Sequence, residues 1–331
     1  MVRRQSLGRH QVWFYLAAIC VGLLVGGAAP QLGGVLEALV WPLLALLLFT
    51  TFLQVPLGQL QTVLQDRRFF TAILLGNFLL MPLVLWGVLA VTPLDPATRL
   101  GVIMVLLVPC TDWFVTFTHL GRGDGRRAVA ATPALLVIQF LLLPIYLRVF
   151  MGEGFVGTVP WSNALIAFGT LIVLPALAAR ALQRRAERSP SARDAIERLA
   201  WAPIPLLALV LGAIAASQVQ LVRESLALLV PLSGAYLAYL IGALIVGLLL
   251  GRAFCLNVGS ARTLVFSLAT RNSFVVLPLA LALPPAWHAA VVAIAFQSLV
   301  ELLGMVALVR LVPRLVAGRR SSARGDQRDA G

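Results

Sequence analysis

The chain has 331 residues, of which 60% are hydrophobic and only 12% are charged, and its mean hydropathy is +0.94. Soluble proteins carry roughly 45–50% apolar and about 25% charged residues. The composition therefore argues against a soluble enzyme, a disordered chain and a disulfide scaffold, and it indicates a membrane protein. The formal net charge is +13 and every basic residue is an arginine. These arginines lie between apolar segments, which argues against a nucleic-acid-binding protein.

Ten apolar segments follow one another along the chain, and a membrane span needs about 20 such residues. Hydrocarbon offers no partner for unpaired backbone groups, so each segment is predicted to be a helix. The first follows basic residues, as in a signal peptide, but it exceeds the ~7–15 apolar residues of such signals and is interpreted as a retained span. The predicted spans are residues 11–29, 35–57, 69–91, 98–119, 127–150, 160–183, 199–217, 229–250, 260–283 and 287–316.

The arginines predict the orientation of the chain. Alternate loops hold 22 of them, the other loops hold only Arg99, Arg148 and Arg223, and Arg271 lies within a span. Cytoplasmic loops are enriched in basic residues. We therefore expect a multi-pass protein of the plasma (inner) membrane with both termini in the cytoplasm. The longest internal loop is expected at 183–198, and residues 317–331 are expected to form a disordered cytoplasmic tail.

Five spans precede the connection near residues 151–160 and five follow it. The two halves, residues 1–155 and 156–316, then have opposite orientations, which predicts an inverted repeat. Transporters built this way hold their substrate at the midplane on interrupted helices. The fourth and ninth spans are equivalent in such a repeat, and each has a polar centre: Cys110, Thr111 and Asp112 after Pro109, and Thr270, Arg271, Asn272 and Ser273. We predict that both spans are broken near the middle of the ~30 Å hydrocarbon core.

Asp112 and Arg271 are charged residues in these polar centres. A charge at the bilayer centre costs about 2.5–3.5 kcal/mol. Their matched depth and opposite signs predict that they face each other where the two breaks cross. The pair is either a structural ion pair that closes the crossing or part of a substrate or proton site, and one pair can do both.

Cys110 and Glu301 are further candidates. Cys110 follows Pro109, which removes a backbone donor from the helix, so the thiol can face a cavity. The simpler interpretation is that Cys110 packs as a small hydrophobe, as most buried cysteines do. Glu301 lies deep in the tenth span, one turn after Gln297 on the same face. It is interpreted either as a structural hydrogen-bonding residue or as a functional carboxylate.

Enzyme signatures are missing from the sequence. It contains no HExxH, no GxSxG and no Walker loop. We therefore predict a protein that is not an enzyme, with no catalytic residues and no cofactor. Transport, if active, is coupled to an ion gradient.

Three segments carry a resemblance to a known family: GVIMVLLVPCTDWFVTFTHLGRGD, ATRNSF and SLVELLGMV. They resemble the bile-acid/sodium symporter-like superfamily and, within it, the arsenite efflux permeases. The resemblance implies an all-α integral membrane fold with ten transmembrane helices, an inverted five-plus-five repeat, and broken helices 4 and 9 that cross. It also implies that Cys110 and Glu301 match the family's functional cysteine and glutamate. The implied activity is efflux of trivalent arsenite or antimonite coupled to proton antiport.

The expected site combines these residues. Trivalent arsenic is thiophilic, so Cys110 is the predicted ligand of the transported metalloid. Glu301 and Asp112 are the predicted proton-exchanging groups. The expected substrate-binding set comes from the two breaks: Cys110, Thr111, Asp112, Arg271, Asn272 and Ser273.

Three departures from the permease pattern keep an alternative open. Val275 stands where the family has an acidic residue, Arg271 replaces a neutral polar residue, and Asp112 adds a carboxylate. The alternative is a sodium-coupled symporter of an organic anion, in which Arg271 would attract the anion but repel sodium. The expected partners are a small-molecule substrate, a proton or a sodium ion, and the lipid bilayer, with no nucleic acid.

Overall fold

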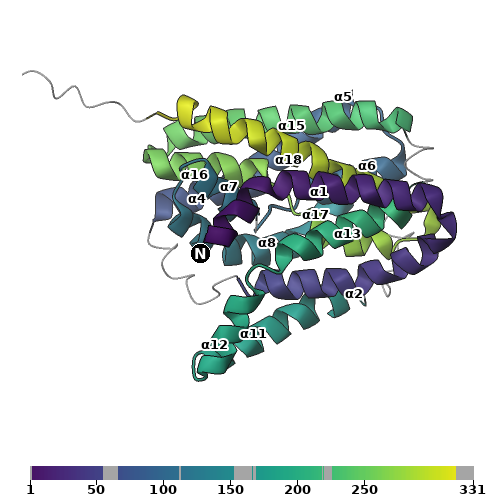
Figure 1. The fold of residues 1–331 in the computed structure, drawn as a ribbon. Helices are drawn as coiled ribbons and strands as arrows, with labels where there is room; N and C mark the ends of the chain where they lie inside the picture. The colour runs from purple at the N-terminus through teal and green to yellow at the C-terminus, as the bar shows by residue number, and fades with distance from the viewer. Residues whose placement is uncertain are drawn as a thin grey trace, which may run out of the picture.

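The structure is a computed structural model that describes residues 2–54, 66–111, 113–152, 166, 169–217, 219 and 226–317. The described residues are helical apart from short connections, and their only β-type pairing is one isolated bridge. The helices lie side by side in a bundle (Figure 1). The α-helices are α1 (Val2–Ala28), α2 (Gly33–Phe52), α4 (Arg67–Leu75), α5 (Met81–Val91), α6 (Pro96–Leu106), α7 (Trp113–Leu120), α8 (Gly125–Met151), α11 (Leu174–Ala186), α12 (Pro190–Leu199), α13 (Pro203–Ser217), α15 (Leu226–Ala253), α16 (Val258–Ala269), α17 (Ser273–Leu281) and α18 (Ala289–Leu315).

Shorter helical segments lie between these helices in the described residues. Two are 3₁₀ turns, η1 (Pro30–Leu32) and η5 (Pro285–Trp287). Two are π-helical, η3 (Gly76–Leu80) and η4 (Gly169–Val173). The η3 segment joins α4 to α5, so the third predicted span is one continuous helical rod with a π-type distortion at its centre. Such distortions are rare and frequently occur at functional sites.

The outer faces of the bundle suit a bilayer. Large apolar side chains are widely exposed there, among them Leu24 (72%), Val149 (72%) and Val230 (77%). Within the described residues, five helices are long and apolar enough to cross a membrane, or six if the bent pair α12–α13 counts as one. This supports a multi-pass membrane protein, whereas a total of ten spans remains a prediction. Part of the predicted sixth span, residues 160–183, lies outside the described residues.

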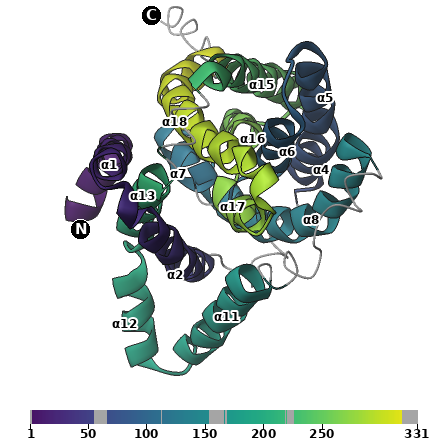
Figure 2. The ribbon, with the colours of Figure 1, turned by 90° about the vertical axis from the view of Figure 1, so that its right-hand side faces the viewer.

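The helices form two groups, which are separate in the view along the bundle (Figure 2). In the smaller group α13 packs against α1 and α2, and α2 also packs against α11. The larger group contains α4 to α8 and α15 to α18. The two groups touch where α17 meets α2 and where α1 meets α18. Beside these contacts lies an apolar hollow of about 180 Å³, lined by residues of α1, α13, α15 and α18.

The central segment 183–198 is not the loop that its polar sequence predicts. It is a helical hairpin in which α11 continues to Ala186 and α12 begins at Pro190. Arg193 closes the turn by donating from Nε to the carbonyl of Ala186 at 2.6 Å and from Nη2 to that of Glu187 at 3.1 Å. This bonding satisfies carbonyls that the end of α11 leaves without helical partners. The hairpin projects from the smaller group of helices (Figures 1 and 2).

Close backbone packing joins α1 to α13. A Cβ atom built on Gly22 would lie 2.2 Å from the carbonyl oxygen of Gly212, and one on Gly26 would lie 2.2 Å from that of Ala216. Lipid tails are as apolar as leucine, so membrane helices associate mainly through such close van der Waals packing. The spacing of the two glycines, four residues apart, is typical of this kind of contact.

We expect Gly22→Ala to destabilise the protein by about 1–3 kcal/mol, because the added methyl group has no space and forces α1 away from α13. The measurement is the melting temperature of the purified protein in detergent. Gly87→Ala is the matched control, since a Cβ atom on Gly87 would meet no heavy atom within 4 Å. Equal melting temperatures for the two variants would contradict the packing argument.

Candidate functional site

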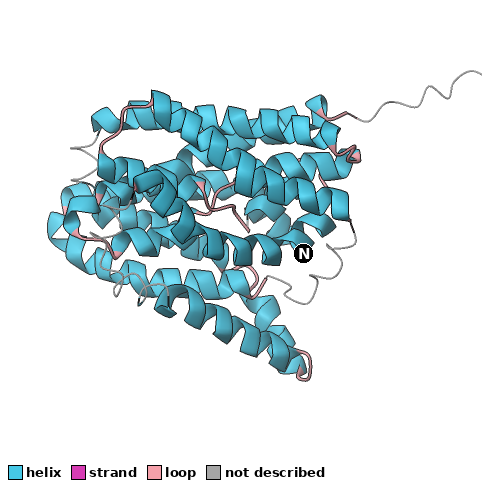
Figure 3. Cartoon of the chain, turned by 180° about the vertical axis from the view of Figure 1, so that it is seen from behind, coloured by secondary structure: helices cyan, strands magenta, loops and turns pink. Residues whose placement is uncertain are grey.

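The fourth and ninth predicted spans are both broken, as the sequence predicts. The fourth consists of α6, which ends at Leu106, and α7, which begins at Trp113. The ninth consists of α16, which ends at Ala269, and α17, which begins at Ser273. Figure 3 shows loop segments inside the bundle as well as at its ends. Thr270 leaves the helix in an extended conformation, with φ −97° and ψ 136°.

The two breaks are hydrogen-bonded to each other through their main chains. The N–H of Cys110 donates to the carbonyl of Thr270 at 3.1 Å, and the N–H of Asn272 donates to the carbonyl of Val108 at 2.8 Å. Pro109 and Arg271 stand opposite each other in the resulting antiparallel bridge. A broken helix in hydrocarbon must find partners for its freed backbone groups. Here each break supplies partners to the other, which fixes the crossing.

Arg271 is buried at this crossing and only 2% exposed. Its guanidinium donates from Nη2 to Oδ1 of Asn77 at 3.1 Å and to the carbonyl of Leu268. The guanidinium carbon also lies 5.3 Å from the centre of the Tyr239 ring, a cation–π contact. The remaining guanidinium nitrogens, Nε and Nη1, have no hydrogen-bond partner among the described residues.

Glu301 connects α18 to the break in the ninth span. Its Oε2 accepts from the main-chain N–H of Arg271 at 2.8 Å and from Nε2 of Gln297 at 2.6 Å. Gln297 in turn accepts from the hydroxyl of Ser273 at 2.7 Å. Glu301 is 1% exposed, and its Oε1 has no hydrogen-bond partner among the described residues. The structure thus places the predicted pair Glu301 and Gln297 on one face of α18, and that face meets the break.

The other predicted site residues lie in or beside the same crossing. Cys110 is 2% exposed and Thr111 is 3% exposed. The carbonyl of Thr111 accepts from the Thr132 hydroxyl at 3.5 Å. Asn272 caps α17, its Oδ1 accepting from the N–H of Val275 at 3.3 Å. Asp112 lies outside the described residues, so its pairing with Arg271 stays a prediction.

Two polar contributors, Asn77 and Tyr239, are not among the site residues that the sequence predicts. Asn77 donates to the Ser267 hydroxyl at 2.9 Å and accepts from Arg271. Tyr239 covers the guanidinium and donates its hydroxyl to the carbonyl of Leu106 at 2.7 Å, at the end of α6. A usable signal was present, because Asn77 is a lone amide and Tyr239 a phenol in otherwise apolar spans.

The crossing is a closed, polar site that holds a guanidinium group and a carboxyl group. Cys110, Arg271 and Glu301 are each at most 2% exposed, so solvent does not reach them in this conformation. Among the described residues, no three His, Cys, Asp or Glu side chains come together as a set of metal ligands. The described residues of the crossing therefore supply one thiol, one guanidinium, one carboxyl group and several neutral polar groups.

A family model supplies the identification. The model of the sodium bile acid symporter family matches residues 41–225, more than half of the chain. The chain belongs to the sodium bile acid symporter family. It is accordingly a secondary transporter of the bile acid/sodium symporter type that acts on small molecules in a membrane. A search of curated proteins gives no match. The matched region includes the break with Cys110, and it ends before Arg271 and Glu301.

Proposed function

We propose that this transporter exports trivalent arsenite or antimonite in exchange for protons. The observation that carries the proposal is the position of Cys110. This thiol is buried in the break of the fourth span, and the same break is hydrogen-bonded to the break that presents Arg271 and Glu301. A soft thiol ligand selects soft centres such as trivalent arsenic.

The thiol chemistry balances without a further reactant. The S–H bond of Cys110 and one As–OH bond of arsenite break, an S–As bond forms, and the proton and hydroxide leave as water. A single thiol forms only one such bond, so the reverse reaction with water releases the metalloid. Three thiols would hold it too tightly for transport.

The polar groups around the crossing also suit this substrate. Arsenite at neutral pH is an uncharged trihydroxide whose hydroxyl groups both donate and accept hydrogen bonds. Arg271 has two donor nitrogens and Glu301 has one acceptor oxygen without partners among the described residues. Buried polar groups normally have partners. We propose that the substrate's hydroxyl groups are the missing hydrogen-bond partners of Arg271 and Glu301. Thr111, Asp112, Asn272 and Ser273, from the same two breaks, complete the proposed substrate-binding set.

Glu301 is the proposed proton carrier, with Asp112 as a second candidate. Ionisable residues within a membrane are rare and usually functional, and carboxylates serve as proton relays in transporters. Glu301 contacts the break directly through the N–H of Arg271. Exchange of its proton would therefore act on the segment that holds the substrate.

The proposed architecture is ten spans in an inverted repeat, with both termini in the cytoplasm of the plasma (inner) membrane. Several helix pairings support the repeat, because they recur when each helix is exchanged for its equivalent in the other half. Thus α6 packs on α18 as α16 packs on α8, and α7 packs on α8 as α17 packs on α18. The pairing of α16 with α7 likewise corresponds to that of α6 with α17.

One observation favours a second candidate, sodium-coupled symport of an organic anion. The guanidinium of Arg271 carries a positive charge, and two of its nitrogens have no partner among the described residues. A carboxylate or sulfonate could accept from both. The same positive charge would repel a sodium ion bound at the crossing, which is why arsenite efflux is the preferred proposal.

We expect Cys110→Ser to reduce arsenite uptake into everted membrane vesicles to the level of vesicles without the protein. Serine keeps the shape of the side chain but replaces a soft ligand with a hard one. The measurement is vesicle-associated arsenic under an imposed proton gradient, at matched protein content.

Cys20→Ser is the matched control and should transport like the unchanged protein, because Cys20 is exposed on α1. Unchanged arsenite transport by Cys110→Ser would refute the metalloid proposal. Sodium-driven uptake of a labelled bile acid by the unchanged protein would establish the second candidate in its place.

A further inference from the structure

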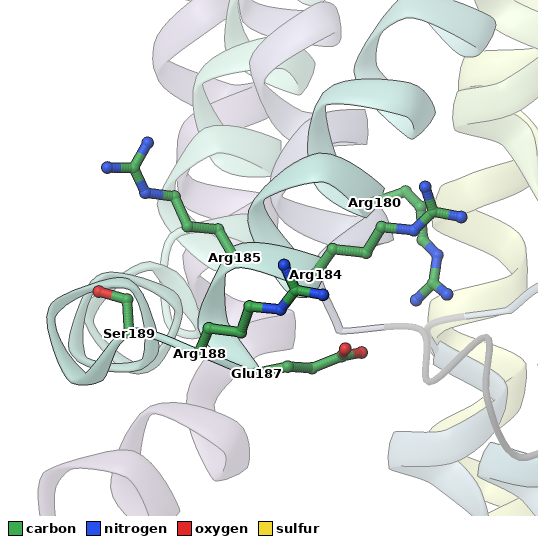
Figure 4. Close-up of a pocket in the computed structure, with 6 residues that line it drawn as sticks. All are labelled: Arg180, Arg184, Arg185, Glu187, Arg188 and Ser189. Atoms are coloured by element: carbon green, nitrogen blue, oxygen red, sulfur yellow. The ribbon is translucent and has the colours of Figure 1, made fainter.

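The α11–α12 hairpin carries a charged hollow far from the crossing. The hollow has a volume of about 720 Å³ and is lined by Arg180, Arg184, Arg185, Glu187, Arg188 and Ser189. Figure 4 shows these side chains on α11 and the turn that follows it, with Arg180 and Arg184 extending to one side of the helix and Arg185 to the other. Four arginines and one glutamate thus contribute to the lining of this hollow.

None of the arginines of this hollow forms an ion pair with another described residue. Within the described part of the chain, the ion pairs join Arg127 to Asp66 and to Asp124. Arg184, Arg185 and Arg188 are exposed, and Arg180 is half-buried. The neighbouring Arg193 differs, because it is bonded to the carbonyls of Ala186 and Glu187. A positively charged surface therefore remains available on a hairpin that Arg193 holds closed.

One stripe of α11 changes from apolar to basic along its length. Arg180 and Arg184 are spaced four residues apart and so lie on one face of the helix, and Arg188 follows in the turn after its end. Leu177, three residues before Arg180, continues this face and is 63% exposed, and the neighbouring Leu174 is 62% exposed. With a rise of about 1.5 Å per residue, Arg184 lies roughly 10 Å along the axis from Leu177. This is the scale on which a lipid changes from acyl chain to phosphate.

Neighbouring features place the stripe at the membrane surface. Trp201, at the start of the next apolar helix, is 55% exposed, and tryptophan is enriched at the membrane–water interface. The side chain of Gln183 donates to the carbonyls of Phe52 and Leu53 at 3.2 and 3.1 Å, which fixes α11 to the end of α2. The hollow is thus held in a fixed position near the end of α2.

We propose that this hollow is a binding site for the phosphate group of an anionic phospholipid, with the acyl chains lying along Leu174 and Leu177. Basic clusters next to a membrane span attract anionic lipid headgroups. The exposed leucines on the same helix favour a lipid over a free phosphate ion, because acyl chains can pack against them and a free ion cannot. The bound lipid would stabilise the α11–α12 hairpin, which leads on to α13.

The test uses the full-length protein in mixed micelles. The probes are phosphatidylglycerol, phosphatidylcholine and inorganic phosphate. The melting temperature and, by native mass spectrometry, the number of bound lipids are measured for each. We expect Arg184→Gln/Arg188→Gln to weaken phosphatidylglycerol binding by about 30-fold, the share of two basic residues at about 1 kcal/mol each. Its melting temperature in phosphatidylcholine alone should equal that of the unchanged protein, because both arginines are exposed.

Arg67→Gln/Arg68→Gln is the matched control, since these two arginines are also exposed, at the start of α4. It should bind phosphatidylglycerol like the unchanged protein. An equal loss of binding in both double variants would show attraction by overall charge and overturn the site. Stabilisation by inorganic phosphate as large as that by phosphatidylglycerol would show a free-anion site and overturn the lipid assignment.

Discussion

Glu301→Gln is expected to abolish proton-coupled arsenite transport while leaving the protein folded. Glutamine keeps an oxygen that can accept from the N–H of Arg271, which in the unchanged protein donates to Oε2 at 2.8 Å. It cannot bind and release a proton. The loss of transport should therefore come from the loss of proton coupling, and the crossing itself should still assemble.

Two measurements separate these effects. In proteoliposomes, an imposed proton gradient should drive arsenite flux through the unchanged protein and none through Glu301→Gln, and a sodium gradient should drive neither. In a weakly buffered detergent solution, arsenite should release protons from the unchanged protein and none from the variant. Formation of the S–As bond yields water and no free proton, so the released protons report on a carboxyl group.

Glu187→Gln is the control for the chemical change, because Glu187 is exposed on the α11–α12 hairpin. It should transport normally. Proton release that persists in Glu301→Gln would exclude Glu301 as the carrier and make Asp112 the candidate. Flux driven by sodium in the absence of a pH gradient would instead support the symporter.

The broken spans were predictable because their causes are local. Pro109 removes a backbone donor, and polar residues at the centre of an otherwise apolar span are costly unless they have partners. The same reasoning predicted that Gln297 and Glu301 share one face of α18, as the structure shows. In each case, a few neighbouring residues contain the information.

The surroundings of Arg271 were not predictable because they depend on distant parts of the chain. The sequence predicts Asp112 as a partner of Arg271 from their matched depth and opposite charge. The described partners are neutral: Asn77, 194 residues away, the carbonyl of Leu268, and the ring of Tyr239. The π-helical segment η3 includes Asn77, and nothing in the apolar sequence around that residue signals such a distortion.

The hairpin was missed for a different reason. The α12 helix (Pro190–Leu199) is short and polar, and a search for long apolar runs assigns such a segment to a loop. Helix formation there is supported by tertiary contacts, since Arg193 bonds back to the end of α11. The helix propensity and hydropathy of residues 190–199 do not predict this contact between Arg193 and the end of α11.

Arg271→Ala is expected to destabilise the protein strongly and to make its stability depend on sodium. The guanidinium of Arg271 is a buried cation at the crossing and donates to Asn77 Oδ1 and to the Leu268 carbonyl, while the main-chain N–H of the same residue donates to Oε2 of Glu301. Removing one charged partner from a buried network typically costs about 3–5 kcal/mol. The variant keeps these oxygen atoms and the carboxylate but has a cavity where the cation was.

A small monovalent cation can enter such a cavity, because oxygen ligands and one carboxylate suit a hard ion. We therefore expect sodium chloride to raise the melting temperature of Arg271→Ala and N-methylglucamine chloride at the same concentration to leave it unchanged. The unchanged protein should show no difference between the two salts, because the guanidinium already occupies the place. In the double variant Arg271→Ala/Glu301→Gln the sodium effect should disappear, since the carboxylate that balances the ion is gone.

Arg262→Ala is the matched control for the loss of an arginine. Arg262 is half-buried at the start of α16 and donates from Nη2 to the carbonyls of Pro313 and Val316 at 3.2 and 2.8 Å, away from Glu301. Its loss should not produce a response to sodium, because no buried carboxylate is left unbalanced there. If sodium raises the melting temperature of the unchanged protein as much as that of Arg271→Ala, then sodium binds at a place that the guanidinium does not occupy. The charge of Arg271 would then be no barrier to sodium coupling, and symport of an organic anion would become the preferred function.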